Sequence, residues 1–235
     1  MIDFLKDIYI SLSRSVNQRE KKKIKEDIVN IGKILNLKLI NEDKIKSRFD
    51  YNKYIFEYES LFEGKIVEII AETNFFEVSY PINKLKINNY VGAFLQNKNI
   101  DLNYNFEGND FEFDVQSLER TFIDKVFAIC DYRIQNMADR DSRHLYDIAK
   151  IIPYINFDDN FKKLAIKVRT DRMKSKNNPS ANPKYDITLM LKEIIDSKFF
   201  ESDYKKLTVK LLYENYPYEK AISDGIKIIC EKNVF

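Results

Sequence analysis

The sequence has few of the residues that cross-link small proteins or bind metals in them. Its 235 residues include no tryptophan, one histidine and two cysteines. Cys130 and Cys230 are too few for the disulfide framework of a small secreted protein, and with one histidine they argue against a zinc site. Both cysteines lie in helical patterns, so we expect them to be small core residues.

Glycine, proline and long apolar runs are also scarce. Five glycines, five prolines, 44% hydrophobic and 32% charged residues exclude a disordered or low-complexity chain. The apolar runs fall far short of the roughly 20 residues that span a membrane. No charged segment followed by an apolar stretch opens the chain, so we expect a cytoplasmic protein with no membrane partner.

Strand patterns dominate the first half of the sequence. Residues 53–60 and 65–72 alternate as two strands around a turn that contains Gly64, which predicts a hairpin. Asn17 followed by Glu20 has the spacing of a capping box and predicts a helix that begins there.

Helix patterns dominate the second half. From Ser117 onward, apolar residues recur every three or four positions, which predicts five or six helices. The length allows one large domain or two small ones. We expect an α+β fold, with a mixed α/β domain over residues 1–116 and a helical bundle over residues 117–235.

The first of these helices carries a lysine within its apolar face. Ser117 is the expected N-cap. The apolar stripe consists of Leu118, Phe122, Val126 and Ile129. Lys125 lies in the middle of that stripe, where its ammonium either extends past its neighbours to water or meets an anion.

The second helix supplies a candidate anion. Asp141 or Ser142 is expected to cap it, and Arg143, His144 and Asp147 follow in its first turns. Asp147 lies four residues after Arg143, so the two could form an ordinary surface pair. Asp147 could equally be the partner of Lys125.

These two helices carry a resemblance to a known family. The run TFIDK (residues 121–125), followed by SRHLYDI (residues 142–148), resembles the AbiEii/AbiGii-type toxin nucleotidyltransferases of bacterial toxin–antitoxin and phage-defence systems. The resemblance implies a polymerase-beta-like fold and transfer of a nucleotide from NTP to an acceptor such as RNA, with tRNA among the candidates. It places Lys125 and Asp147 in the active site, Lys125 and Arg143 on the nucleotide, and implies Mg²⁺ and a protein antitoxin as partners.

Such enzymes need carboxylates on strands to bind Mg²⁺. Residues i and i+2 of a strand face the same way, so a D-x-D pair and an acid on a neighbouring strand can share metal ions. Glu68, between Val67 and Ile69, matches the third acid, although it could also be a solvated side chain. The first pair falls on Met1-Ile2-Asp3 or on Asp7-Ile8-Tyr9, so Asp3 and Asp7 are the remaining candidates, and each register lacks one acid.

The glycine-serine turn that holds triphosphate in the family has no counterpart here. None of the five glycines is followed by serine or threonine. The chain is thus expected to be this family without its first strand and phosphate-binding turn. The alternatives are a catalytically inactive remnant that binds RNA or protein, and a purely structural helical bundle.

A basic segment offers a surface for RNA. Residues 161–184 carry eight lysines and arginines against Asp171 alone, a net charge of +7. We expect RNA to bind through Lys162–Lys184, with Arg169 and Arg172 among the surface positions. A solvated helix face would have the same composition. Residues 175–184 are predicted to be the least structured part of the chain.

Overall fold

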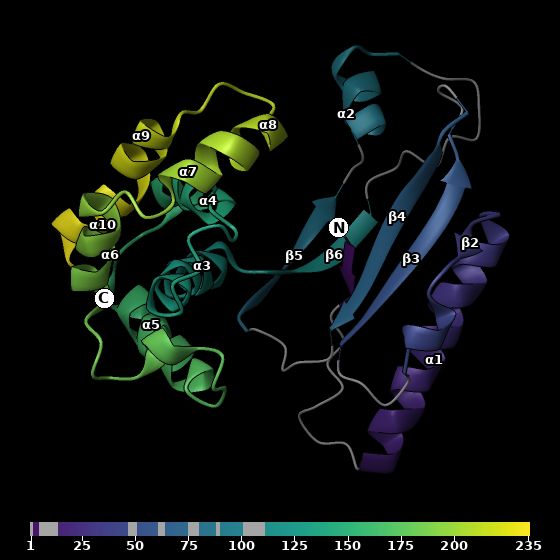
Figure 1. Cartoon of the computed structure of the whole chain (residues 1–235), viewed down its shortest axis with the longest axis horizontal. Coiled ribbons are helices and arrows are strands. Elements are labelled where there is room, and N and C mark those ends of the chain that lie inside the picture. The colour runs from purple at the N-terminus through teal and green to yellow at the C-terminus, as the bar shows by residue number, and fades with distance from the viewer. Residues whose placement is uncertain are drawn as a thin grey trace. The chain divides into compact units, whose positions relative to one another are not determined.

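The computed structural model describes residues 2–4, 14–46, 51–60, 64–74, 80–87, 90–100 and 111–235. The chain forms two compact units, Met1–Ser79 and Tyr80–Phe235. Strands and helices occur in the order that an α+β fold requires, and the C-terminal part is helical, so the predicted fold class is confirmed (Figure 1).

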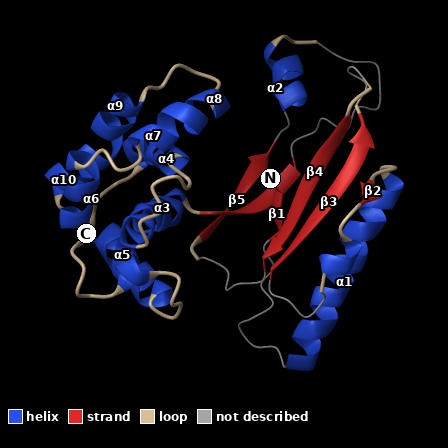
Figure 2. Cartoon of the chain, viewed as in Figure 1, coloured by secondary structure: helices blue, strands red, loops and turns tan. Residues whose placement is uncertain are grey.

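A four-stranded sheet forms the centre of the first unit, in the order β1-β4-β3-β2 (Figure 2). Its longest strands are β3 (Tyr51–Glu59) and β4 (Ile66–Asn74), which pair antiparallel and confirm the predicted hairpin. The short strand β1 (Ile2–Phe4) runs parallel to β4, and β2 (Lys38–Leu39) runs antiparallel to β3.

One long helix covers one face of this sheet. α1 (Arg14–Ile34) packs on Tyr54 and Phe56 of β3, which are 1% and 4% exposed (Figure 1). Gly32 permits this contact, because a Cβ atom there would lie 2.3 Å from the Phe56 ring. Asn17 lies inside α1, so the predicted capping box is wrong: the residues before Asn17 already continue the helix.

A strand pair belongs to the second unit. β5 (Ile82–Ile87) and β6 (Phe111–Gln116) pair antiparallel, with α2 (Tyr90–Asn97) between them in sequence. The Ser117 amide donates to the Pro81 carbonyl at 2.8 Å, which ties this pair to the helix that follows. The compact units therefore divide at residue 79, not near residue 116. A functional boundary at residue 116 stays a prediction.

The rest of the second unit is helical. Residues 117–235 contain no strand. At its centre lies α3 (Leu118–Ile134), whose Phe122, Val126 and Ile129 are fully buried, whereas Leu118 is half exposed. Ser117 caps this helix as predicted, because its hydroxyl accepts from the Arg120 amide at 3.2 Å. Around α3 pack α4 (Arg143–Ile151), η2 (Ile152–Tyr154), α5 (Asp159–Arg172), η3 (Pro179–Ala181) and α6 (Ile187–Asp196).

The last two predicted helices are present, and each contains a π-helical turn. The first consists of α7 (Glu201–Asp203), η4 (Tyr204–Thr208) and α8 (Val209–Leu211). The second consists of α9 (Tyr218–Ala221), η5 (Ile222–Ile226) and α10 (Lys227–Lys232). In the described part of the chain, no helix has both the length and the apolar character needed to cross a membrane.

The segment 175–184 is docked on the bundle, so its prediction as the least structured segment is wrong. Ser180 and Ala181 are fully buried. The Ser180 amide donates to the Asp131 carboxylate at 2.8 Å, and its hydroxyl donates to the Phe127 carbonyl at 3.1 Å. Small residues in this segment let the backbone approach α3 closely enough to form these bonds.

Candidate functional site

Lys125 of α3 meets its anion on α4. Its Nζ atom lies 2.7 Å from Oδ2 of Asp147. The two side chains are 22% and 31% exposed. The partly buried ammonium is therefore paired with a carboxylate, as a charge in an apolar stripe requires. Of the alternatives left open by the sequence, the ion pair with Asp147 is the one observed.

The single histidine completes this cluster. Nδ1 of His144 lies 3.5 Å from Lys125 Nζ and 3.5 Å from Asp147 Oδ2. The imidazole stacks on the Tyr132 ring, with centroids 6.3 Å apart and planes at 13°. The Tyr132 hydroxyl in turn donates to Asp141 at 3.1 Å. We refer to Lys125, His144 and Asp147 as the helical cluster.

The carboxylate of Asp147 is held in its charged form. Burial raises its pKa, but hydrogen bonds from His144 and Lys125 outweigh that effect, so the pKa lies below its ordinary value of 3.8. At neutral pH the cluster therefore holds a full negative charge against the lysine ammonium.

Buried polar groups fix the start of α4. Ser142 is fully buried, and its hydroxyl bonds the Thr208 hydroxyl at 2.7 Å rather than capping the helix. Its amide donates to the Asp203 carboxylate at 3.3 Å. Ser142 occupies the N-cap position without a side-chain cap bond, so the predicted capping by its hydroxyl is wrong. These bonds position the first turn of α4, which carries His144.

Arg143 points away from Asp147. Its side chain is 50% exposed, and its guanidinium lies 3.4 Å from the Asp141 carboxylate. The possible surface pair between Arg143 and Asp147 is therefore replaced by a pair with Asp141. An exposed guanidinium one residue before His144 remains able to contact a phosphate.

A second charged network joins α3 to α5. Arg172 contacts Asp124 at 3.0 Å and Asp131 at 2.7 Å. Arg120 contacts Asp124 at 2.8 Å. Asp131 is 3% exposed, so its charge depends on these partners. Sequence reasoning missed this network, whose members lie far apart along the chain.

The basic segment 161–184 is therefore divided. Arg172 belongs to the buried network, and Arg169 donates to three backbone carbonyls, those of Ala181, Asn182 and Tyr185. The prediction that Arg169 and Arg172 are surface positions is wrong, because both fix the docked segment 175–184. The six lysines of the segment are exposed.

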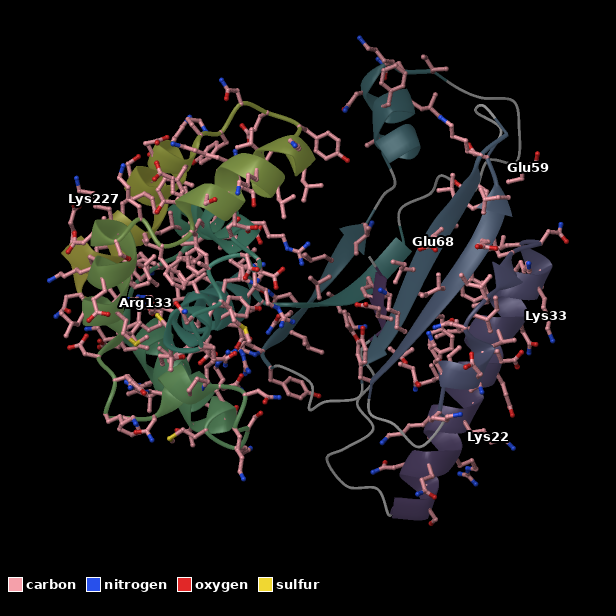
Figure 3. All side chains as sticks on the ribbon, in the orientation of Figure 1. Lys22, Lys33, Glu59, Glu68, Arg133 and Lys227 are labelled. Carbon is pink, nitrogen blue, oxygen red and sulfur yellow. The ribbon has the colours of Figure 1, made fainter. Side chains whose placement is uncertain are left out.

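Acidic side chains gather on the sheet of the first unit. Glu68 of β4 is exposed, and its register partner on β3 is Glu57 (Figure 3). Directly opposed like charges cost stability in a sheet. Asp3 of β1 is paired in register with Glu72 of β4, and Glu72 accepts a hydrogen bond from Tyr51 at 2.7 Å.

These acids share one face of the sheet. Glu68 and Glu72 are four residues apart on β4, so both point the same way, about 13 Å from each other. Asp3 thus has Glu72, not Glu68, as its neighbour. Sequence reasoning missed Glu72, although strand alternation from Glu68 would have indicated it. Asp7 lies outside the described residues. Among the described residues, no three acidic, histidine or cysteine side chains are close enough to hold a metal ion.

The predicted site residues thus fall into two groups. Asp3 and Glu68 belong to the first compact unit, and Lys125, Arg143 and Asp147 belong to the second. The structure brings Lys125 and Asp147 into contact.

Comparison with known protein families identifies the chain over nearly its whole length. The family model described as "Nucleotidyl transferase AbiEii toxin, Type IV TA system" matches residues 2–222, nearly the whole chain. No curated protein and no solved structure matches the chain.

Proposed function

Because this chain belongs to the AbiEii family of nucleotidyltransferase toxins from type IV toxin–antitoxin systems, we propose that it transfers a nucleotide from NTP to an RNA acceptor, with tRNA as the first candidate. The observation that carries the proposal is the contact between Lys125 and Asp147, 2.7 Å long and partly buried. A lysine at such a position is a compact positive charge that suits a triphosphate.

The helical cluster would hold the triphosphate. Asp147 keeps the Lys125 ammonium in place in the absence of nucleotide, and His144 limits how far either side chain can move. Arg143, which is half exposed, would add a second cation to the phosphates. A triphosphate would then draw the ammonium toward its own charge while Asp147 remains a hydrogen-bond partner.

The reaction is a phosphoryl-group displacement. A hydroxyl oxygen of the acceptor attacks the α-phosphorus, a new P–O bond forms, and the bond to the pyrophosphate oxygen breaks. The hydroxyl proton passes to solvent water. Positioning and charge neutralisation supply most of the catalysis in such transfers.

The acidic side chains on the sheet are of the type that binds Mg²⁺. Carboxylate oxygens are its preferred protein ligands, and Asp3, Glu68 and Glu72 lie on neighbouring strands of one sheet. Asp3 and Glu72, which are partners in the sheet register, would hold the ion, and Mg²⁺ when bound supplies positive charge to phosphate groups. Glu68, about 13 Å from Glu72, lies too far along the strand to share that ion.

The remaining partners follow the same proposal. The exposed lysines of residues 162–184 would contact RNA phosphates, without the two arginines that the fold uses. A protein antitoxin is the expected regulator. The comparisons give no support to the alternative of an inactive remnant that only binds RNA or protein.

The test is a transfer assay with purified protein, Mg²⁺, a tRNA pool and each of four α-labelled NTPs in turn. We expect label in the RNA with at least one NTP, and its loss in Lys125→Met. Lys227→Met, an exposed lysine of α10, is the matched control and should retain transfer. Absence of label with every NTP and every RNA supplied would overturn the proposal.

A further inference from the structure

A groove of about 700 Å³ lies on the helical unit and involves none of the residues given a role above. The end of α4, the η2 turn and the helix over residues 218–232 form it. Its apolar surface includes Ile152, Ile155 and Ile228. This volume suits a ligand about the size of a nucleotide.

The groove is positively charged. Its charged residues are Lys150, Lys220, Lys232 and Asp224, for a net charge of +2. Asp224 already accepts a hydrogen bond from the Tyr216 hydroxyl at 2.9 Å. An anionic ligand in the groove would therefore meet an excess of positive charge. The one acid of the groove, Asp224, is already hydrogen-bonded to Tyr216.

Two of the lysines are held in no salt bridge among the described residues. Lys150 is paired with Glu214 at 2.9 Å. Within the part of the chain that the structure describes, neither Lys220 nor Lys232 forms an ion pair. Each instead lies over an aromatic ring: Lys220 is 4.8 Å from the centre of Tyr216, and Lys232 is 5.6 Å from the centre of Phe157.

An unused aromatic ring lies in the same groove. Tyr154 at the end of η2 is 74% exposed. Surface tyrosines of this kind are platforms on which nucleic-acid bases stack. A ring for a base beside two unpaired ammonium groups is the combination by which proteins bind single strands.

We propose that this groove binds a single-stranded segment of RNA, with phosphates on Lys220 and Lys232 and a base on Tyr154. A free nucleoside triphosphate fits less well. Such ligands are commonly held by glycine-rich loops or helix N-termini, and no glycine lines the groove.

The inference rests on the proposed function for its ligand class. If RNA is the acceptor, the groove is a docking site for it at one end of α4, the helix that also carries Asp147. It is separate from the exposed lysines of α5, and the two surfaces can be tested independently.

Binding of a fluorescent single-stranded RNA of about 12 nucleotides tests whether Lys220 and Lys232 contact phosphates. Fluorescence anisotropy is measured on the full chain without NTP or Mg²⁺, so transfer cannot affect the result. Lys220→Glu with Lys232→Glu should weaken binding about tenfold or more, and should flatten its dependence on salt. The matched control is Lys192→Glu with Lys227→Glu, two exposed lysines that line a different groove. It should stay within about twofold of the unmodified chain.

The same assay tests the ring. Tyr154→Ala should weaken binding about tenfold, whereas Tyr213→Ala, at a tyrosine 99% exposed, should have no effect. A duplex of equal length should bind more weakly than the single strand. The proposal that the groove binds RNA is refuted if the unmodified chain binds no RNA or if Tyr154→Ala binds it normally. It is also refuted if the double variant of Lys220 and Lys232 and the control double variant weaken binding equally. If the unmodified chain binds RNA through the groove but transfers no nucleotide to RNA, the proposed function is refuted and the groove is not.

Discussion

At the scale of single residues, Lys125 shows what a sequence can and cannot determine. Its place in an apolar stripe predicts that it needs a partner. The residue that supplies the anion is Asp147, 22 positions away, because α4 packs on α3. His144, the third member of the helical cluster, has no assigned role in the sequence, because its contacts come from packing.

The ion pair should be measurable as a coupling energy. Lys125→Met, Asp147→Asn and the double variant form a cycle in urea unfolding. We expect a coupling of about 1–2 kcal/mol, since the pair is charged but partly exposed. The exposed pair of Lys162 and Asp159, 3.7 Å apart, is the control and should couple by about 0.5 kcal/mol or less. Equal coupling in the two cycles would contradict the burial described for the cluster.

Asp147 should also make stability depend on pH. Its pKa is lowered in the folded chain, so its contribution is present above the ordinary value of 3.8 and is lost as pH falls through the depressed folded value. The difference in unfolding free energy between the unmodified chain and Asp147→Asn should therefore shrink between about pH 5 and pH 3. A difference that stays constant over this range would show that the carboxylate gains nothing from Lys125 and His144.

At the scale of elements, local patterns were sufficient for most strands and helices. The hairpin of β3 and β4 and the cap of α3 at Ser117 follow from alternation and capping chemistry. The docked segment 175–184 does not, because its asparagines and prolines have the composition of a loop. Its order depends on the hydrogen bond that Ser180 donates to Asp131 and on those that Arg169 donates to backbone carbonyls, and both partners lie elsewhere along the chain.

The ion pairs that Arg172 forms between α5 and α3 should make a large contribution to the stability of the second unit. Arg172→Met removes both ion pairs and leaves Asp131 buried with a charge. We expect a loss of about 3 kcal/mol in unfolding free energy, measured with urea. Lys163→Met on the same helix, at an exposed position, should change stability by about 0.5 kcal/mol or less. If the two variants were equally stable, Arg172 would have to be a surface residue, as the sequence suggested.

At the scale of the whole molecule, the two compact units divide at residue 79, whereas the change from strand to helix patterns falls near residue 116. The difference arises because β5 and β6 pair locally and bond to the start of α3, which a count of element types does not reveal. Of the predicted site residues, Lys125 and Asp147 are in contact, and the functional role of Glu68 stays a prediction. Glu72 was missed although alternation from Glu68 places it on the same face; that Asp3 is its partner follows only from the register between β1 and β4.

The most direct test of the central claim is the mass of the acceptor RNA after incubation with the protein, Mg²⁺ and NTP. If the chain is a nucleotidyltransferase whose helical cluster holds the triphosphate, mass spectrometry should show RNA heavier by one or more nucleoside monophosphate residues. The increase should disappear in Lys125→Met and persist in Lys227→Met. An RNA of unchanged mass in every reaction, or an equal increase with Lys125→Met, would contradict the account.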